Sequence, residues 1–200
     1  HRVNRYALLV SLLTWFAFFG QYTYVGAFLE RRFGFDSAKI GFSTLVVGLG
    51  YILGSQLGGR LSDRIGRRTV ILSGLGWLAL FLFLLPNLSH MPLVILAIFA
   101  MGFGFSFTYS ALLTLIGELA PDARNTMMSA NYSGTHIGLM AGSATLGLIL
   151  AWSGFRAMGL ASASACILAA VLAQWFVFRD HHRMSADPRD PGQAPSDPEA

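Results

Sequence analysis

Polar side chains inside long uncharged stretches are the first places in this sequence where chemistry could occur. Tyr132 and His136 lie four residues apart in the stretch 125–155, which holds no Asp, Glu, Lys or Arg. Residues at i and i+4 of a helix share one face, so both rings could bind one solute, and a histidine could also relay a proton. The other hydrogen-bonding candidates in uncharged stretches are Gln21, Tyr24 and Tyr109.

Each of these residues also has a plain structural interpretation. His136 could bond only a neighbouring helix, and Tyr24 could belong to the belt of aromatic residues at a membrane surface. Ser and Thr in such stretches more often bond the carbonyl four residues earlier, or an adjacent helix, than a solute. The sequence leaves these alternatives open.

A second candidate is the charged run around Asp63, which stands among four arginines. A carboxylate there can pair with Arg64 or Arg67, or cap the positive N-terminus of an adjacent helix. Gly66 supplies the conformational freedom for a reversal of the chain, and Gly59 is expected to let a neighbouring backbone approach closely. The simpler interpretation is a positively charged loop with an incidental acid.

Composition indicates what kind of element must carry these residues. Charged residues make up 12% of the 200 residues and hydrophobic residues 54%, whereas soluble domains hold about 25% charged residues. The mean hydropathy is +0.56, and glycine and phenylalanine are abundant. This balance is typical of packed membrane helices. It excludes a disordered chain, a disulfide scaffold and a nucleic-acid-binding domain.

The positions of the charges predict an all-α, polytopic membrane protein with six transmembrane helices. A helix needs about 20 apolar residues to cross a hydrocarbon core of about 30 Å. Helices are expected rather than strands because backbone groups cannot stay unpaired in lipid. Residues 179–200, rich in Asp-Pro pairs, are predicted to be a disordered cytoplasmic tail. The predicted transmembrane domain covers 1–178, with helices over about 6–29, 40–59, 69–85, 92–116, 126–151 and 157–178.

The distribution of Arg and Lys predicts the orientation in the membrane. With the N-terminus inside, ten of the 14 basic residues fall in inner segments and four in outer loops. Cytoplasmic segments carry the excess of Arg and Lys, so both termini are predicted to be cytoplasmic. Because the first residue is His rather than Met, the chain is expected to be a fragment or an excised half.

Small residues spaced by four predict close contacts between helices. One such stripe is Gly134, Gly138 and Gly142, and another is Gly50 and Gly54. Either stripe could be a sliding surface between two halves of a larger protein or a static packing surface.

The charged run resembles the cytoplasmic signature of the major facilitator superfamily, G-x-L-x-D-R-x-G-R-R, which lies between the second and third helices of a six-helix repeat. The matching positions are Gly59, Leu61, Asp63, Arg64, Gly66, Arg67 and Arg68. The resemblance covers nearly the whole chain and implies one half of a transporter with two such repeats. The stretch 92–116 lacks the arginine of many N-terminal halves, and 126–151 lacks the Gly-Pro pair of N-terminal halves in efflux members. The chain is therefore expected to be the C-terminal half.

This resemblance implies a secondary active transporter that works by alternating access in the cell inner membrane, and the chain is similar to bacterial drug or sugar efflux members. The matching residues would form a latch between two access states. The implied partners are a small-molecule solute, a coupling proton, the lipid bilayer and the missing N-terminal half, or a homodimer partner if the chain is complete. The sequence holds no ATP-binding loop, metal cluster or dinucleotide fingerprint, so no cofactor, metal or nucleic acid is expected.

Two other function classes compete with transport. An intramembrane serine protease needs a serine and a base from different helices, whereas Ser133 and His136 lie on one predicted helix, so an enzyme is not expected. A six-helix sensor or scaffold that transports nothing stays an alternative.

Overall fold

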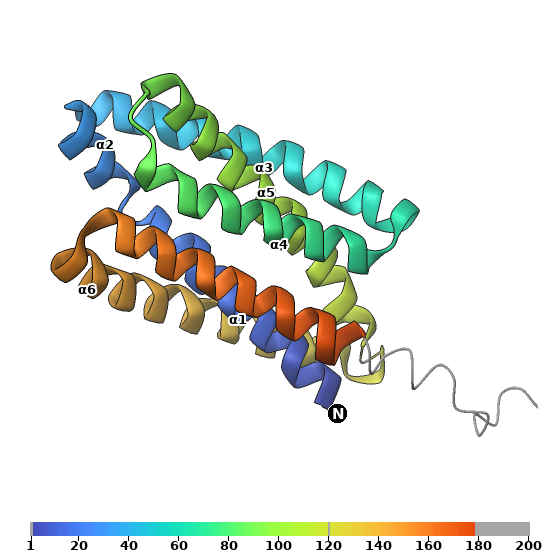
Figure 1. Cartoon of the computed structure of the whole chain (residues 1–200). Helices are drawn as coiled ribbons and strands as arrows, with labels where there is room; N and C mark the ends of the chain where they lie inside the picture. Colours follow the sequence, from blue (N-terminus) through green and yellow to red (C-terminus); the bar gives the residue numbers. More distant parts are fainter. Residues whose placement is uncertain (1, 120, 179–200) are drawn as a thin grey trace, which may run out of the picture.

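The computed structural model describes residues 2–119 and 121–178, and in this part of the chain every regular element is helical. The predicted tail at 179–200 lies outside the described residues. The helices form the all-α bundle expected from composition (Figure 1). Their bounds are α1 Arg2–Tyr22, α2 Val25–Phe33, α3 Ser37–Ile65, α4 Arg67–Leu84, α5 Met91–Glu118 and α6 Arg124–Leu172, with the short turns η1 Leu85–Asn87, η2 Pro121–Ala123 and η3 Ala173–Phe178.

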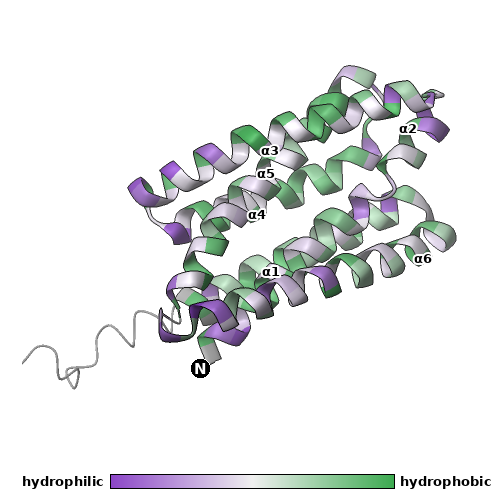
Figure 2. Ribbon diagram, turned by 180° about the vertical axis from the view of Figure 1, so that it is seen from behind, coloured by the Kyte–Doolittle hydropathy of each residue, from purple (hydrophilic) through white to green (hydrophobic). Residues whose placement is uncertain are grey.

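Five helical stretches of the described chain are long and apolar enough to cross a membrane. The fifth, Pro121–Trp175, has 55 residues, which as one straight helix would span about 80 Å. Gly154, with φ 78° and ψ −178°, interrupts this stretch, and glycine adopts a positive φ without steric cost. The chain folds back there, so α6 consists of two antiparallel arms (Figures 1 and 2).

The helix predicted over 6–29 is not continuous, because α1 and α2 are separated by a turn. Thr23 Oγ1 donates to Phe19 O at 2.8 Å, a bond to the carbonyl four residues earlier that bends helices. Tyr24 Oη donates to Ser143 O at 2.8 Å. The second bond holds the turn against the first arm of α6.

Glycines at intervals of four bring two pairs of helices into backbone contact. On α3, a Cβ at Gly50, Gly54 or Gly58 would collide with phenylalanine carbonyls of α5. On α6, a Cβ at Gly138 or Gly142 would collide with carbonyls of α1. Both contacts lie within this chain, so static packing accounts for these positions.

Two glycines expected to make such contacts do not make them. A Cβ at Gly59 would meet nothing within 4 Å, and its neighbour Gly58 makes the close approach instead. The reason is helical phase: with 3.6 residues per turn, Gly58 lies on the face of Gly54, whereas Gly59 is turned away. Gly134 also has open space around it, because no backbone comes within 4 Å at that turn of α6.

Hydrophilic residues gather mainly at the two ends of the bundle, and apolar residues fill its length (Figure 2). One end holds the N-terminus of α1, the α3–α4 turn and the start of α6, and the other holds α2, η1 and the reversal at Gly154 (Figure 1). Large apolar side chains remain exposed on α3, including Leu45 at 66% and Phe42 at 62%. Such a surface suits lipid or another helical unit.

Candidate functional site

Three helices bring aromatic, amide and imidazole side chains together, with Asn131 buried between the helices and His136 at the exposed edge. Asn131 of α6 is 1% exposed, and its Nδ2 donates to Tyr109 Oη of α5 at 3.1 Å. The Trp15 ring of α1 lies edge-on to the Tyr109 ring, with 5.5 Å between their centroids. The centroid of the His136 ring lies 6.5 Å from that of Trp15. We call Trp15, Tyr109, Asn131 and His136 the polar aromatic cluster.

Two polar atoms of this cluster, Trp15 Nε1 and Asn131 Oδ1, are buried without a hydrogen-bond partner in the described part of the chain. A buried polar group without a partner costs free energy. The Tyr109 hydroxyl lies close enough to interact with Trp15, so Asn131 Oδ1 is the atom of the cluster that a ligand could satisfy. Phe19 stacks on Trp15 at 4.5 Å between centroids, and Phe105 stacks on Tyr109 at 5.7 Å. The arrangement suits a group that is flat, largely apolar and able to form hydrogen bonds.

The predicted solute-binding residues divide into two groups. Tyr109 and His136 belong to the polar aromatic cluster, and Tyr132, 55% exposed in this chain, lies one turn before His136. Gln21 and Tyr24 lie elsewhere. Gln21 is fully buried, and its Nε2 donates to the α4 backbone at 2.9 Å, while Tyr24 bonds the α6 backbone. Both of these side chains tie helices together.

Trp15 and Asn131 are the cluster members that the sequence analysis did not select. A tryptophan in an apolar helix carries no signal of its own, because packing and interfacial anchoring explain it equally well. Asn131 offered a usable signal, since a side-chain amide is costly in lipid and marks an inward-facing position.

The α3–α4 connection, which we call the basic turn, comprises residues 58–68. Gly66 has φ 87° and ψ 146°, a region that favours glycine, so the expected chain reversal is present. Its backbone N–H donates to Ser62 O at 3.1 Å. Arg68 Nε donates to Gln174 Oε1 at 3.2 Å, which ties the turn to η3.

The prediction that Asp63 pairs with Arg64 or Arg67, or caps the N-terminus of α4, is wrong. Arg67 forms an ion pair with Glu118 at the end of α5, an acid that the sequence analysis did not select. The N-cap of α4 is Gly66, and it receives no side-chain cap. The helix breaks between Asp63 and Arg67, so the i, i+4 geometry of a continuous helix does not hold. Asp63 and Arg64 are exposed, and neither forms an ion pair within the described residues.

These features define an α-helical, multi-pass membrane protein with a polar cluster between its helices. Residues 7–198 match the family profile of the Major Facilitator Superfamily. The match covers most of the chain, and the chain belongs to this family. The family consists of membrane transporters rather than enzymes.

Curated relatives carry transport or resistance names. The chain is 28% identical over 144 residues to the uncharacterized MFS-type transporter YceJ of Bacillus subtilis, covering 70% of this chain and 37% of that protein. It is 26% identical over 167 residues to the MFS-type transporter YwfA of the same organism, covering 83% and 40%. It is 30% identical over 155 residues to the fosmidomycin resistance protein of Escherichia coli, covering 73% and 37%. The chain thus spans well under half the length of these relatives.

Proposed function

We propose that this chain is one six-helix half of a secondary active transporter that moves a small organic solute by alternating access. Membership of the Major Facilitator Superfamily supports the proposal. The matches cover 37 to 40% of three relatives, as expected for one of two repeats. Counting Val3–Phe33 as one span and the two arms of α6 separately gives six spans among the described residues. We assign the chain to the C-terminal half, so its partner is an N-terminal half or, as a second arrangement, another copy of this chain.

We propose further that the basic turn faces the cytoplasm and that the bilayer is the cell inner membrane. The N-terminus, the basic turn and the start of α6 lie at one end of the bundle (Figure 1), so the arginines of these three segments are gathered on one side. The opposite end carries a smaller set, namely Arg31, Arg32, Lys39 and Arg156. Cytoplasmic segments carry the excess of Arg and Lys, which favours this orientation.

The polar aromatic cluster is the proposed solute site, and the hydrogen bond between Asn131 and Tyr109 is the observation that carries it. His136 lies 12 residues after the start of α6, or about 18 Å at 1.5 Å per residue. That depth is near the middle of a core of about 30 Å, where transporters hold their solutes. Tyr132 and His136 are exposed in this chain, so both side chains can face a second half.

A drug is the solute class we favour over a sugar. One relative is named for fosmidomycin resistance, and the cluster presents aromatic rings with few hydrogen-bonding atoms. We propose that the solute is exported from the cell in exchange for a proton. His136 is the proposed proton carrier of this half, because an imidazole can both accept and donate a proton.

The basic turn is the proposed conformational latch. Its contacts within this chain use Arg67, paired with Glu118, and Arg68, bonded to Gln174. Those contacts fix the turn, and Asp63 is exposed and forms no ion pair with any residue that the structure describes. A carboxylate held in this way can meet a helix N-terminus of the other half in one access state and lose that contact in the other.

Efflux by the complete protein that contains this chain tests the proposal. Expression in a susceptible Escherichia coli strain should raise tolerance of fosmidomycin, or of one compound in a panel of drugs and sugars, and should lower accumulation of that compound. Asn131→Ala should remove the effect. Ser129→Ala, an exposed position on the same arm of α6, is the matched control. If the membrane-inserted protein changes the accumulation of no compound, the sensor-or-scaffold alternative is favoured.

A further inference from the structure

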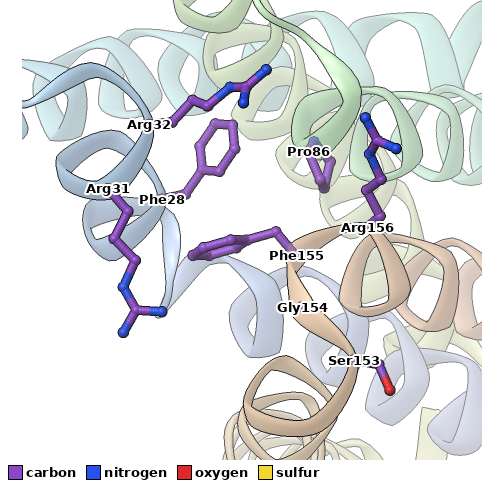
Figure 3. A pocket seen from close by; sticks show the side chains of 8 residues that line it. All are labelled: Phe28, Arg31, Arg32, Pro86, Ser153, Gly154, Phe155 and Arg156. Carbon is purple, nitrogen blue, oxygen red and sulfur yellow. The ribbon is translucent and has the colours of Figure 1, made fainter.

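A pocket opens at the end of the bundle opposite the basic turn, and its volume is about 340 Å³. The C-terminal half of α2 lines one side, Pro86 of η1 contributes a second side, and the reversal of α6 at Gly154 forms a third (Figure 3). After the positive φ of Gly154, the Phe155 ring reaches Phe28 of α2, and Arg156 lies on the other side of the pocket, near Pro86 (Figure 3). The proposed solute site and the basic turn use none of these residues.

Three arginines line this pocket, and no carboxylate among the described residues lines it. Arg31 and Arg32 come from α2, and Arg156 comes from the start of the second arm of α6 (Figure 3). Within the described residues none of the three forms an ion pair. Arg32 Nη2 donates to Ser89 Oγ at 2.9 Å, which steadies that guanidinium at the rim. Cations that share a pocket without a counter-charge repel one another, so an anion would stabilise the arrangement.

The walls between the arginines are apolar. Phe28 is buried, and its ring meets that of Phe155 edge-on at 5.3 Å between centroids. The two rings and Pro86 lie around one space, the side chains of Arg32 and Arg156 extend beside it, and the Arg31 side chain points away from it (Figure 3). The pocket therefore combines a cationic rim with an apolar wall, at a helix end where membrane proteins meet lipid headgroups.

We propose that this pocket binds the phosphate of an amphiphilic phosphate ester, with Arg32 and Arg156 as the principal phosphate contacts and Phe28 and Phe155 against the apolar part. Guanidinium groups bind phosphate oxygens through paired, charge-assisted hydrogen bonds. Such a phosphate ester has two sources, the headgroup of an anionic phospholipid and a phosphorylated solute. Both present the same group to the arginines.

Native mass spectrometry and calorimetry on the complete protein in detergent test this site. The lipid arm compares phosphatidylglycerol with phosphatidylcholine, and the solute arm titrates inorganic phosphate into lipid-free protein. Arg32→Gln and Arg156→Gln should each weaken binding by about tenfold, the loss expected for one charge-assisted contact. Lys39→Gln is the matched control, because it removes one positive charge at the same end from an exposed residue that does not line the pocket.

If the protein prefers phosphatidylglycerol, and if both arginine variants lose this preference while the control keeps it, the result supports the site with a lipid headgroup as its ligand. Saturable binding of inorganic phosphate with the same pattern, and no lipid preference, supports it with a phosphorylated solute. The proposal is overturned if the protein shows neither the preference for phosphatidylglycerol nor saturable binding of inorganic phosphate. It is also overturned if the arginine variants and the control bind these ligands equally well. Transport of the panel compounds is scored separately, so failure of this site leaves the proposed function standing.

Discussion

Asn131 Nδ2 donates a hydrogen bond to Tyr109 Oη at 3.1 Å, and this bond joins the first arm of α6 to α5. The two residues stand 22 positions apart in the sequence, on helices that the sequence does not pair. Asn131 keeps its Oδ1 without a partner in the described part of the chain. The pair therefore holds two helices together and leaves one buried acceptor unsatisfied, which supports the proposed solute site.

Removing the Tyr109 hydroxyl should distinguish a role of this residue in solute binding from a role in stability. Tyr109→Phe keeps the ring stacked on Phe105 and removes the acceptor of the Asn131 amide. We expect a higher KM for the transported compound with a modest stability loss, of about 1 kcal/mol or less for a hydrogen bond between membrane helices. Transport kinetics and thermal unfolding of the purified variant measure the two effects. An unchanged KM would remove Tyr109 from the solute site.

Asp63→Asn should impair transport while the protein is inserted at normal abundance. The side chain forms no ion pair within the described residues, so its neutralisation should cost this half no contact. Uptake into vesicles, normalised to the amount of protein, measures the effect. Transport at the parental rate would show that Asp63 has no latch role, and loss of abundance would indicate a structural one.

Glycines of α3 offer a matched pair of substitutions. Gly54→Ala would drive a Cβ into the Phe103 carbonyl, whereas the Cβ of Gly59→Ala would enter open space. Overpacking typically costs about 1 to 3 kcal/mol, so Gly54→Ala should lower the unfolding temperature clearly and Gly59→Ala should leave it nearly unchanged. Equal stability of the two variants would contradict the packing of α3 on α5.

Labelling can establish the orientation of the basic turn. Cys166 is fully buried, so a cysteine introduced at Asp122, which is exposed in η2, can be followed against little background. An impermeant maleimide should label this position only after the cells are opened. Labelling of intact cells would reverse the proposed orientation.

Charge spacing and hydropathy predict the all-α membrane fold because each span must satisfy its backbone internally and hold few charges. Gly66 was predictable for a related reason, since a tight reversal favours a residue without a Cβ. The pairing of Arg67 with Glu118 was not predictable, because it depends on how α3, α4 and α5 end relative to one another. The place of Trp15 in the polar aromatic cluster was not predictable for the same reason, because tertiary packing rather than a local sequence pattern sets its neighbours.

Substitutions of His136 test proton coupling in this half. The ring lies 6.5 Å from Trp15 between centroids, and the residue is exposed in this chain, so it can meet solute, water or the other half. His136→Gln keeps hydrogen bonding and removes the imidazole, which is the proposed proton carrier. We therefore expect it to alter the pH dependence of transport more than the maximum rate, whereas His136→Leu should reduce transport at every pH. Rates measured across a pH series in vesicles distinguish these effects. An unchanged profile in the Gln variant would exclude proton coupling at His136, and full activity of the Leu variant would exclude the residue from the solute site.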